Sequence, residues 1–257
     1  MIKKKSIYEQ PMNEHLRILL RLEHLFEGIT YHLKGATTSD SRAVINLLLE
    51  TIDCAGRADL KTEIQKRLVQ YVQGLEKWQN TPNVDAERIT QLMTKIENVL
   101  DNLKARDGQI GENLTQHQLL NSIKQRANIP GGTSHADLPI YHHWLQKPPK
   151  QRQNELNEWL TALEPLRDAV NLELYFIRNN TVSSQETATN GLYQTTLEEE
   201  QDYQLIQIQL PLEHSCYPDI NSGRHRLTIR FYEQINAWER PLQTEQNLQF
   251  ELRYCLG

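Results

Sequence analysis

Three arginines lie close together near the end of this chain, at Arg224, Arg226 and Arg230. Side chains of a β-strand alternate between its two faces, so these three arginines would project to one side. The other side would carry three apolar residues, Leu227, Ile229 and Phe231. A guanidinium group is a planar fork of donors that fits carboxylate or phosphate in a bidentate manner. The spacing therefore predicts a strand with one packed face and one anion-recognition face.

The arginines stand out because their surroundings are acidic. Residues 181–257 contain eleven acidic and five basic residues, a net formal charge of −6, and three of the five basic residues are in this strip. Net charge does not explain such clustering. The alternative is a half-exposed strand whose arginines only keep a sheet edge soluble.

Composition limits the classes of function. The chain has 257 residues, 38% of them hydrophobic, and a formal charge of −5, so we expect a folded protein without the basic excess of a duplex-DNA binder. Cys54, Cys216 and Cys255 match no disulfide or zinc pattern, which favours a reducing cytosol. The N-terminus is not followed by the apolar stretch of a signal peptide, and no apolar run approaches the roughly 20 residues needed to span a bilayer.

Apolar residues recur at helical spacing through the first 180 residues. The pattern predicts helices over about 14–33 and 40–55, then from Asp59 and from Asp85, with the last two forming an antiparallel hairpin. Further helices are expected around 119–123, over about 139–144, and over about 150–178, where Pro165 should restart or kink the helix.

The pattern changes beyond Asn179. Asn190-Gly191 predicts a turn, and apolar residues alternate over 206–210, 227–231 and 248–254, as expected for strands of a small antiparallel sheet. Helices followed by strands indicate an α+β protein. The expected domains are residues 1–180, mainly helical, and residues 181–257, mainly β-strand and carrying the arginines.

No catalytic, metal or cofactor constellation is evident. The turn at Pro130-Gly131-Gly132 lacks the spacing and the lysine of a phosphate-binding loop. His142 and His143 are adjacent on a short helix, so they point to different faces and cannot chelate one ion. We therefore predict a binding protein rather than an enzyme, with no cofactor and no metal.

Three segments together resemble the ZapD (Z-ring-associated protein D) family of bacterial cell-division proteins. The first is Pro11 to Arg17 with Leu20 to Glu23, and the second is Ile129 to Gly132 with Asp137 to Pro139 and His142 to Leu145. The third is Leu210 to Pro218, leading into the arginine strip. The second segment is the most specific of the three.

The resemblance implies a cytoplasmic homodimer, recruited to the division site at midcell, that binds the C-terminal tail of the tubulin-like GTPase FtsZ and bundles FtsZ filaments. It also implies a basic tail-binding surface contributed by both parts of the fold. The positions carried over are Arg57, Arg226 and Arg230, with Arg21 and His142. Arg224 belongs to the same strip, and Lys61 is added because it lies on the first turn of the helix that follows Arg57. The helix around His117 and Gln118 is less basic than the family pattern.

Two other functions remain as alternatives. A nucleic-acid-binding protein would use the same arginines, with His225 and nearby aromatic residues, although the overall acidity makes it less favoured. An enzyme would rest only on His142 and Asp137 beside the glycine-rich turn.

Overall fold

The computed structural model describes residues 5–56, 59–79, 85–105, 108–223 and 225–257. The chain divides into two compact units. The first, here called the strand unit, comprises residues 1–17 and 175–257, and the second, the helical unit, comprises residues 18–174. Each unit is described by itself.

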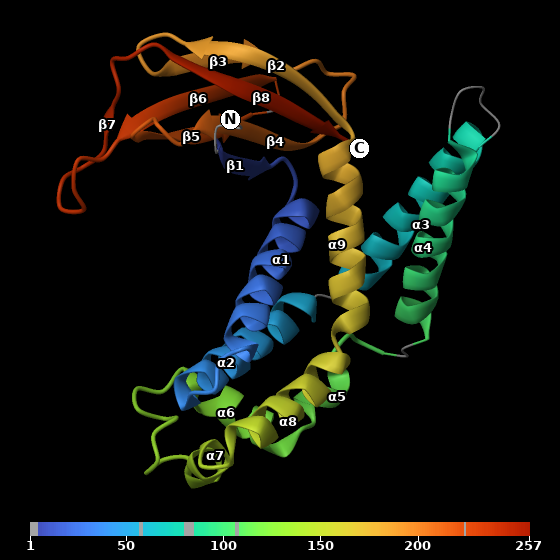
Figure 1. Ribbon diagram of the computed structural model, residues 1–257, viewed down its shortest axis with the longest axis vertical. Helices are drawn as coiled ribbons and strands as arrows, with labels where there is room; N and C mark the ends of the chain where they lie inside the picture. The colour runs from blue at the N-terminus through green and yellow to red at the C-terminus, as the bar shows by residue number, and fades with distance from the viewer. Residues whose placement is uncertain (1–4, 57–58, 80–84, 106–107, 224) are drawn as a thin grey trace. The chain divides into compact units, whose positions relative to one another are not determined.

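The helices follow the order of Figure 1. Their bounds are α1 Glu14–Leu33, α2 Thr38–Ala55, α3 Leu60–Gln79, α4 Ala86–Lys104, α5 Glu112–Thr115, α6 Gln118–Ala127, α7 Pro139–Leu145, α8 Pro149–Thr161 and α9 Glu164–Asn179. The predicted α+β class is confirmed, since helices are followed by antiparallel sheets.

Local capping explains where α2 and α4 begin. Thr37 and Asp40 form a capping box at the start of α2, and the side chain of Asp85 accepts a hydrogen bond from the backbone of Arg88 at the start of α4. These contacts satisfy backbone donors that would otherwise have no partner in the first turn. The predicted hairpin is confirmed, because α3 and α4 lie side by side (Figure 1). The stretch predicted over 150–178 is two helices, α8 and α9, with Pro165 in the first turn of the second.

A buried arginine holds part of the helical unit together. Arg152 on α8 is only 4% exposed. Its guanidinium donates to the Ser41 hydroxyl at 3.0 Å and to the backbone carbonyls of Ala36, Leu145 and Lys147. One side chain therefore connects α8 with α2, with the segment after α1 and with the end of α7. These carbonyls need a partner because burial without one is costly.

The strand unit contains two antiparallel sheets. One has the order β1-β4-β8-β2, and the other β3-β6-β5, with β7 pairing to β6. The strands are β1 Lys5–Pro11, β2 Thr181–Ala188, β3 Leu192–Thr196, β4 Tyr203–Pro211, β5 Cys216–Ser222, β6 Arg226–Glu233, β7 Leu242–Gln243 and β8 Leu248–Leu256. The predicted turn at Asn190-Gly191 joins β2 to β3, and both residues have positive φ.

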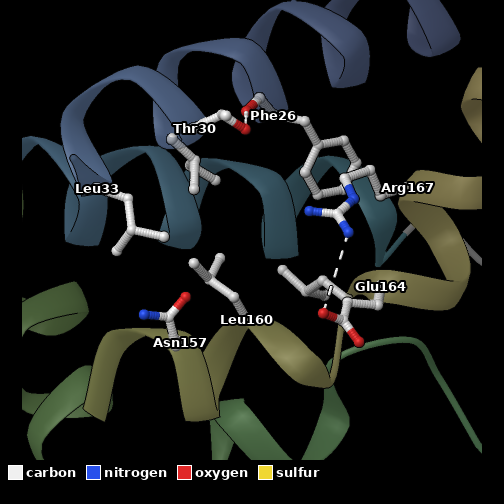
Figure 2. A pocket seen from close by; sticks show the side chains of 9 residues that line it. Phe26, Thr30, Leu33, Asn157, Leu160, Glu164 and Arg167 are labelled. Carbon is white, nitrogen blue, oxygen red and sulfur yellow. Dashed lines mark hydrogen bonds and ion pairs between the residues drawn. The ribbon is translucent and has the colours of Figure 1, made fainter. Parts of the chain in front are cut away.

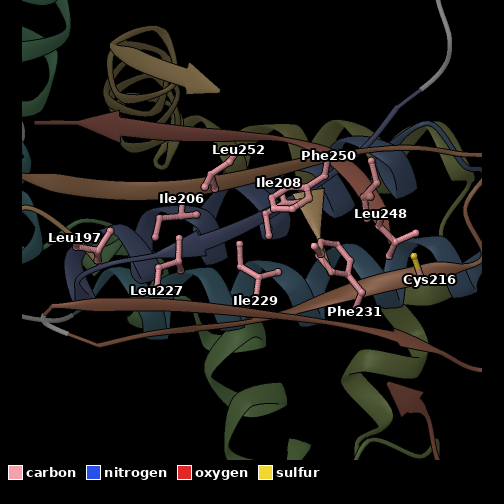
Figure 3. Packing of buried hydrophobic residues seen from close by; sticks show 12 residues of the cluster. Leu197, Ile206, Ile208, Cys216, Leu227, Ile229, Phe231, Leu248, Phe250 and Leu252 are labelled. Carbon is pink, nitrogen blue, oxygen red and sulfur yellow. The ribbon is translucent and has the colours of Figure 1, made fainter. Parts of the chain in front are cut away.

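Apolar residues from the two sheets meet in one core (Figure 3). Ile206 and Ile208 on β4 and Phe250 and Leu252 on β8 face Ile229 and its neighbours on β6. The Phe231 and Phe250 rings lie 5.1 Å apart between centroids. The predicted apolar residues of these strands lie in this core. Burial alternates along β8, whereas β4 also buries Leu205 and Gln207 on its other face.

Two features of the strand unit were not predicted. Strand β1 near the N-terminus pairs with β4 over seven residues, from Lys5 opposite Pro211 to Pro11 opposite Leu205. The strands also form two sheets rather than the single small sheet that was expected. Alternation shows which side chains are buried, but it does not show which strands are neighbours.

None of the described helices combines the length and the apolar character needed to cross a membrane.

Replacing Arg152 tests its role in the helical unit. We expect Arg152→Ala to lower the free energy of unfolding by about 3 kcal/mol, because buried carbonyls lose their donor. Urea unfolding followed by tryptophan fluorescence reports the helical unit, since Trp144 and Trp159 are buried and stacked there. The control is Arg126→Ala at an exposed position, where the loss should stay within about 0.5 kcal/mol. Equal losses in both variants would contradict this role.

Candidate functional site

The arginine-bearing strand β6 is the central strand of its sheet. It pairs with β3 on one side and with β5 on the other. The interpretation of the arginines as protection for a sheet edge is therefore wrong, because β6 has neighbours along both sides. Its inner face is buried in the core through Leu227, Ile229 and Phe231, all 0% exposed. Only the outer face of β6 is available to a partner.

We call this outer surface the arginine face, and the register of three strands defines it. On β6 it carries Arg226, Thr228, Arg230 and Tyr232. From β3 come Thr196, Gln194 and Leu192, opposite the first three of these, and from β5 come Asn221, Asp219 and Tyr217, opposite the last three. Arg226 and Arg230 are four residues apart, so their Cα atoms lie about 13 Å from each other along the strand.

The two guanidinium groups have no anionic partner in the described part of the chain. Neither Arg226 nor Arg230 makes an ion pair or a side-chain hydrogen bond with a described residue. Arg226 is exposed and Arg230 is half-buried. Thr228 between them is 9% exposed, and its hydroxyl accepts a hydrogen bond of 3.3 Å from the Gln194 amide. The arginine face therefore presents two guanidinium groups without a partner among the described residues, one on each side of the hydrogen-bonded Thr228.

An acidic residue also belongs to this face. Asp219 on β5 lies directly opposite Arg230, and it is exposed. Opposite charges at directly paired positions attract each other, so the Asp219 carboxylate weakens the field of Arg230 for any other anion. Alternation alone did not identify Asp219, because its position follows from the pairing of β5 with β6.

The two ends of the arginine face differ in chemistry. At one end the Tyr217 and Tyr232 rings lie 6.1 Å apart between centroids. At the other end His225 lies 3.2 Å from the Glu199 carboxylate, within an acidic segment that includes Glu198 and Asp202. The sequence analysis missed Tyr232, although it continues the same alternation as Arg226 and Arg230.

The remaining predicted residues lie elsewhere in the chain. Arg57 and Arg224 fall outside the described residues. Arg21, Lys61 and His142 are in the helical unit, and each contacts a different group. The Arg21 guanidinium lies 2.6 Å from the Glu50 carboxylate, and this hydrogen bond raises the pKa of Arg21.

Lys61 and His142 are also engaged locally. The Lys61 ammonium donates to the Gly108 carbonyl at 3.5 Å. The exposed His142 ring lies 5.7 Å from the His135 ring between centroids. The structure thus brings Arg226 and Arg230 onto one face, and it describes these other residues in a separate unit.

The helical unit has hollows of its own, and one of them is a notch between α1, α8 and α9. Figure 2 shows Phe26, Thr30 and Leu33 on one side and Asn157 and Leu160 on the other. Arg167 and Glu164 lie at one end, with 4.0 Å between their charged groups. The notch holds about 120 Å³, below the roughly 300 Å³ of typical small-molecule sites. It is too small for a drug-sized ligand.

Another hollow, of about 570 Å³, lies beside α7 and α8. Glu155 lines this hollow, and its carboxylate accepts hydrogen bonds from the Trp144 indole and the Lys147 ammonium, both at 2.7 Å. Burial raises the pKa of Glu155, but these hydrogen bonds outweigh burial and lower the pKa overall. Because the chain already satisfies this carboxylate, its main role is to hold α7 against α8.

The described residues contain no group of three histidine, cysteine or acidic side chains placed to hold a metal ion.

Comparison with known proteins gives a consistent result. The sequence matches the family described as "ZapD: Cell division protein" over residues 20–230, a span that includes Arg226 and Arg230. It is 33% identical over 255 residues to the cell division protein ZapD of Methylococcus capsulatus, which covers 99% of this chain and 100% of that protein. It is 35% identical over 248 residues to the ZapD of Chromobacterium violaceum, covering 96% and 98% of the two chains. The ZapD of Coxiella burnetii is 34% identical over 256 residues, with 99% of both chains covered.

Proposed function

The chain belongs to the ZapD family of cell division proteins, and from that premise we propose that it binds the C-terminal tail of FtsZ and bundles FtsZ filaments. It does so without catalysis, as a homodimer in the cytoplasm that is recruited to the division site at midcell. The observation that carries this proposal is the pair of free guanidinium groups on the outer face of a central strand.

The geometry of the arginine face suits a short extended peptide. The distance of about 13 Å between Arg226 and Arg230 equals about four residues of an extended chain. A tail with two carboxylates at that spacing would bind one guanidinium with each. Strand β6 is paired with β3 and β5, and its inner face packs in the core. Little binding free energy is therefore lost in ordering the site.

Charge alone does not supply the affinity. Exposed ion pairs contribute only about 0 to 1 kcal/mol each, so apolar side chains of the tail must contribute as well. Tyr217 and Tyr232 offer aromatic surface at one end of the face. Charge then sets the register and speeds association, while apolar contact slows dissociation.

We also propose that four residues of the helical unit contribute to binding of the tail, namely Arg57, Arg21, His142 and Lys61. The described contacts distinguish two of these residues, Arg21 and His142. Arg21 is the weaker candidate, because Glu50 already neutralises it at 2.6 Å. His142 is exposed and offers a ring donor without a carboxylate in contact among the described residues.

Bundling follows from repetition of the site. A dimer carries two arginine faces, and two sites are the minimum for a bridge between filaments. A filament displays many tails, so modest affinity for one tail becomes large avidity through effective concentration.

Binding of nucleic acid by the same arginines is less well supported. Asp219 lies on the arginine face and Glu198, Glu199 and Asp202 lie at its end. A phosphate backbone needs an extended run of positive charge, and these carboxylates interrupt it.

Removing both arginines is the direct test of the proposal. Arg226→Ala with Arg230→Ala should weaken binding of a labelled FtsZ tail peptide at least tenfold, or about 1.4 kcal/mol, in fluorescence anisotropy. The charge-matched control is Arg126→Ala with Arg167→Ala in the helical unit, which should bind like the parent protein. Equal binding by parent and Arg226/Arg230 variant would place the site elsewhere. A salt dependence that corresponds to release of several counterions would favour nucleic acid instead.

Replacing Asp219 should strengthen binding of the tail peptide, whereas replacing the arginines should weaken it. Asp219→Asn should bind the tail peptide about two- to fivefold more tightly, because Arg230 loses a competing carboxylate worth less than about 1 kcal/mol. The gain should shrink as salt is raised, since exposed charges are screened. Glu245→Gln, an exposed position in the same unit, is the control for overall charge. An unchanged affinity for Asp219→Asn would show that Arg230 does not contact the tail's carboxylates.

Sedimentation separates tail binding from bundling. The protein should bring full-length FtsZ filaments into the pellet, and FtsZ lacking its tail should remain in the supernatant, because each bridge depends on the tail. Equal pelleting of the two forms would contradict the tail as the attachment point.

A further inference from the structure

Three large apolar side chains are exposed on the segment that joins β6 to β7, residues 234–242, which we call the tryptophan loop. Trp238 is 97% exposed and Ile235 is 82% exposed, the highest values among the large apolar side chains that the structure describes, and Leu242 is 68% exposed. In Figure 1 this loop projects beyond the end of β6. Single apolar residues are common on protein surfaces, but three of them on one short loop indicate an interaction surface.

The tryptophan loop is held in shape by its own hydrogen bonds. The side-chain oxygen of Asn236 accepts from the backbone amides of Trp238 at 2.9 Å and Glu239 at 3.2 Å, and its amide nitrogen donates to the Glu239 carboxylate at 2.7 Å. At the base of the loop the Thr244 hydroxyl donates to the Glu233 carboxylate. Because these contacts already order the loop, little free energy is lost in ordering it on binding.

The charges on and beside the tryptophan loop are mainly acidic. Residues 233–246 contain three glutamates and one arginine. Glu239 and Glu245 are exposed, and neither forms an ion pair with a described residue. Both glutamates, together with Ile235 and Leu242, line a hollow of about 420 Å³. An apolar surface beside unpaired carboxylates is complementary to a partner that carries apolar and basic side chains.

Charge disfavours three other partners for this loop. The cytoplasmic leaflet of a membrane is anionic and would repel the glutamates. Two copies of the loop would bring like charges together, which costs free energy. The FtsZ tail is proposed to bind through its carboxylates, and these suit the arginine face rather than an acidic loop.

We propose that the tryptophan loop is a docking site for a basic amphipathic segment of a partner protein. The apolar side chains of that segment pack on Trp238, Ile235 and Leu242. Its lysines or arginines lie near Glu239 and Glu245. Tryptophan is enriched among the residues that contribute most to protein interfaces, and the face of its ring also attracts cations. This docking site does not depend on the proposed tail binding, because the loop and the arginine face carry opposite charges.

Acrylamide quenching of tryptophan fluorescence tests whether the loop is occupied. The chain has four tryptophans, of which Trp144 and Trp159 are buried and Trp78 is 59% exposed. In the full chain with Trp78→Phe, quenching therefore reports mainly Trp238. A synthetic peptide with leucine and lysine at the spacing of an amphipathic helix should protect Trp238 from quenching. The same peptide with glutamate in place of lysine should not.

Anisotropy of the labelled leucine–lysine peptide identifies the residues that bind it. Trp238→Ser with Leu242→Ser should weaken binding by about tenfold or more, because two apolar contacts are lost. The matched control is Trp78→Ser, which removes an exposed tryptophan from the helical unit and should bind like the parent protein. All three positions are exposed, so these replacements should leave the fold intact.

Reversing one charge tests the acidic part of the site. Glu245→Lys should weaken binding of the leucine–lysine peptide by roughly two- to fivefold, and the loss should shrink as salt is raised. Glu200→Lys makes the same change in charge at another exposed position of the strand unit, and it should have a smaller effect. Equal losses in the two variants would show that only the overall charge of the protein matters.

Three results would overturn the proposal. The first is that the leucine–lysine peptide leaves Trp238 open to quenching, and the second is that the Trp238/Leu242 variant binds this peptide like the parent protein. The third is that phosphatidylglycerol vesicles or the FtsZ tail peptide protect Trp238 and the leucine–lysine peptide does not. The Trp238/Leu242 variant should still bind the FtsZ tail peptide, so failure of this docking site and failure of tail binding give different results.

Discussion

The position of β6 at the centre of its sheet is the constraint on which the candidate site depends. Its backbone is engaged on both sides by β3 and β5, and its inner side chains are fully buried. A partner can therefore reach β6 only through its outer side chains. The same packing fixes the strand, so the guanidinium groups project from a rigid support, as sites built on strands generally do.

Rigidity and exposure have opposite effects on affinity. A fixed strand lowers the entropy cost of binding, because only the arginine side chains must be ordered. The guanidinium groups remain largely hydrated, however, and an exposed ion pair contributes little. These terms together favour a site of modest affinity and fast exchange. Such a site would suit the proposed bundling of filaments, in which many weak contacts hold a bundle and each contact can still be released.

The sequence predicted which side chains of β6 share a face, but it did not predict which strands are neighbours. Alternation along one strand is a local property, and it correctly separated Arg226 and Arg230 from Leu227, Ile229 and Phe231. The pairing of strands is not local. Strand β1 pairs with β4 about 200 residues later, and its segment mixes Lys5, Glu9 and Gln10 with Ile7 and Tyr8 without a clear apolar face. Asp219 was missed for the same reason, since only the register of β5 on β6 places it opposite Arg230.

The carboxylates around the arginine face limit which anions can bind to it. The chain has a formal charge of −5, and carboxylates lie both on the face, at Asp219, and at its end, at Glu199. A long polyanion that reached Arg226 and Arg230 would also approach these carboxylates, and like charges brought together cost free energy. A short peptide with two acidic residues can contact both arginines and end before it reaches the acidic segment. If the arginine face is the docking site, as proposed, the same carboxylates that weaken it for anions in general would favour a short tail over nucleic acid.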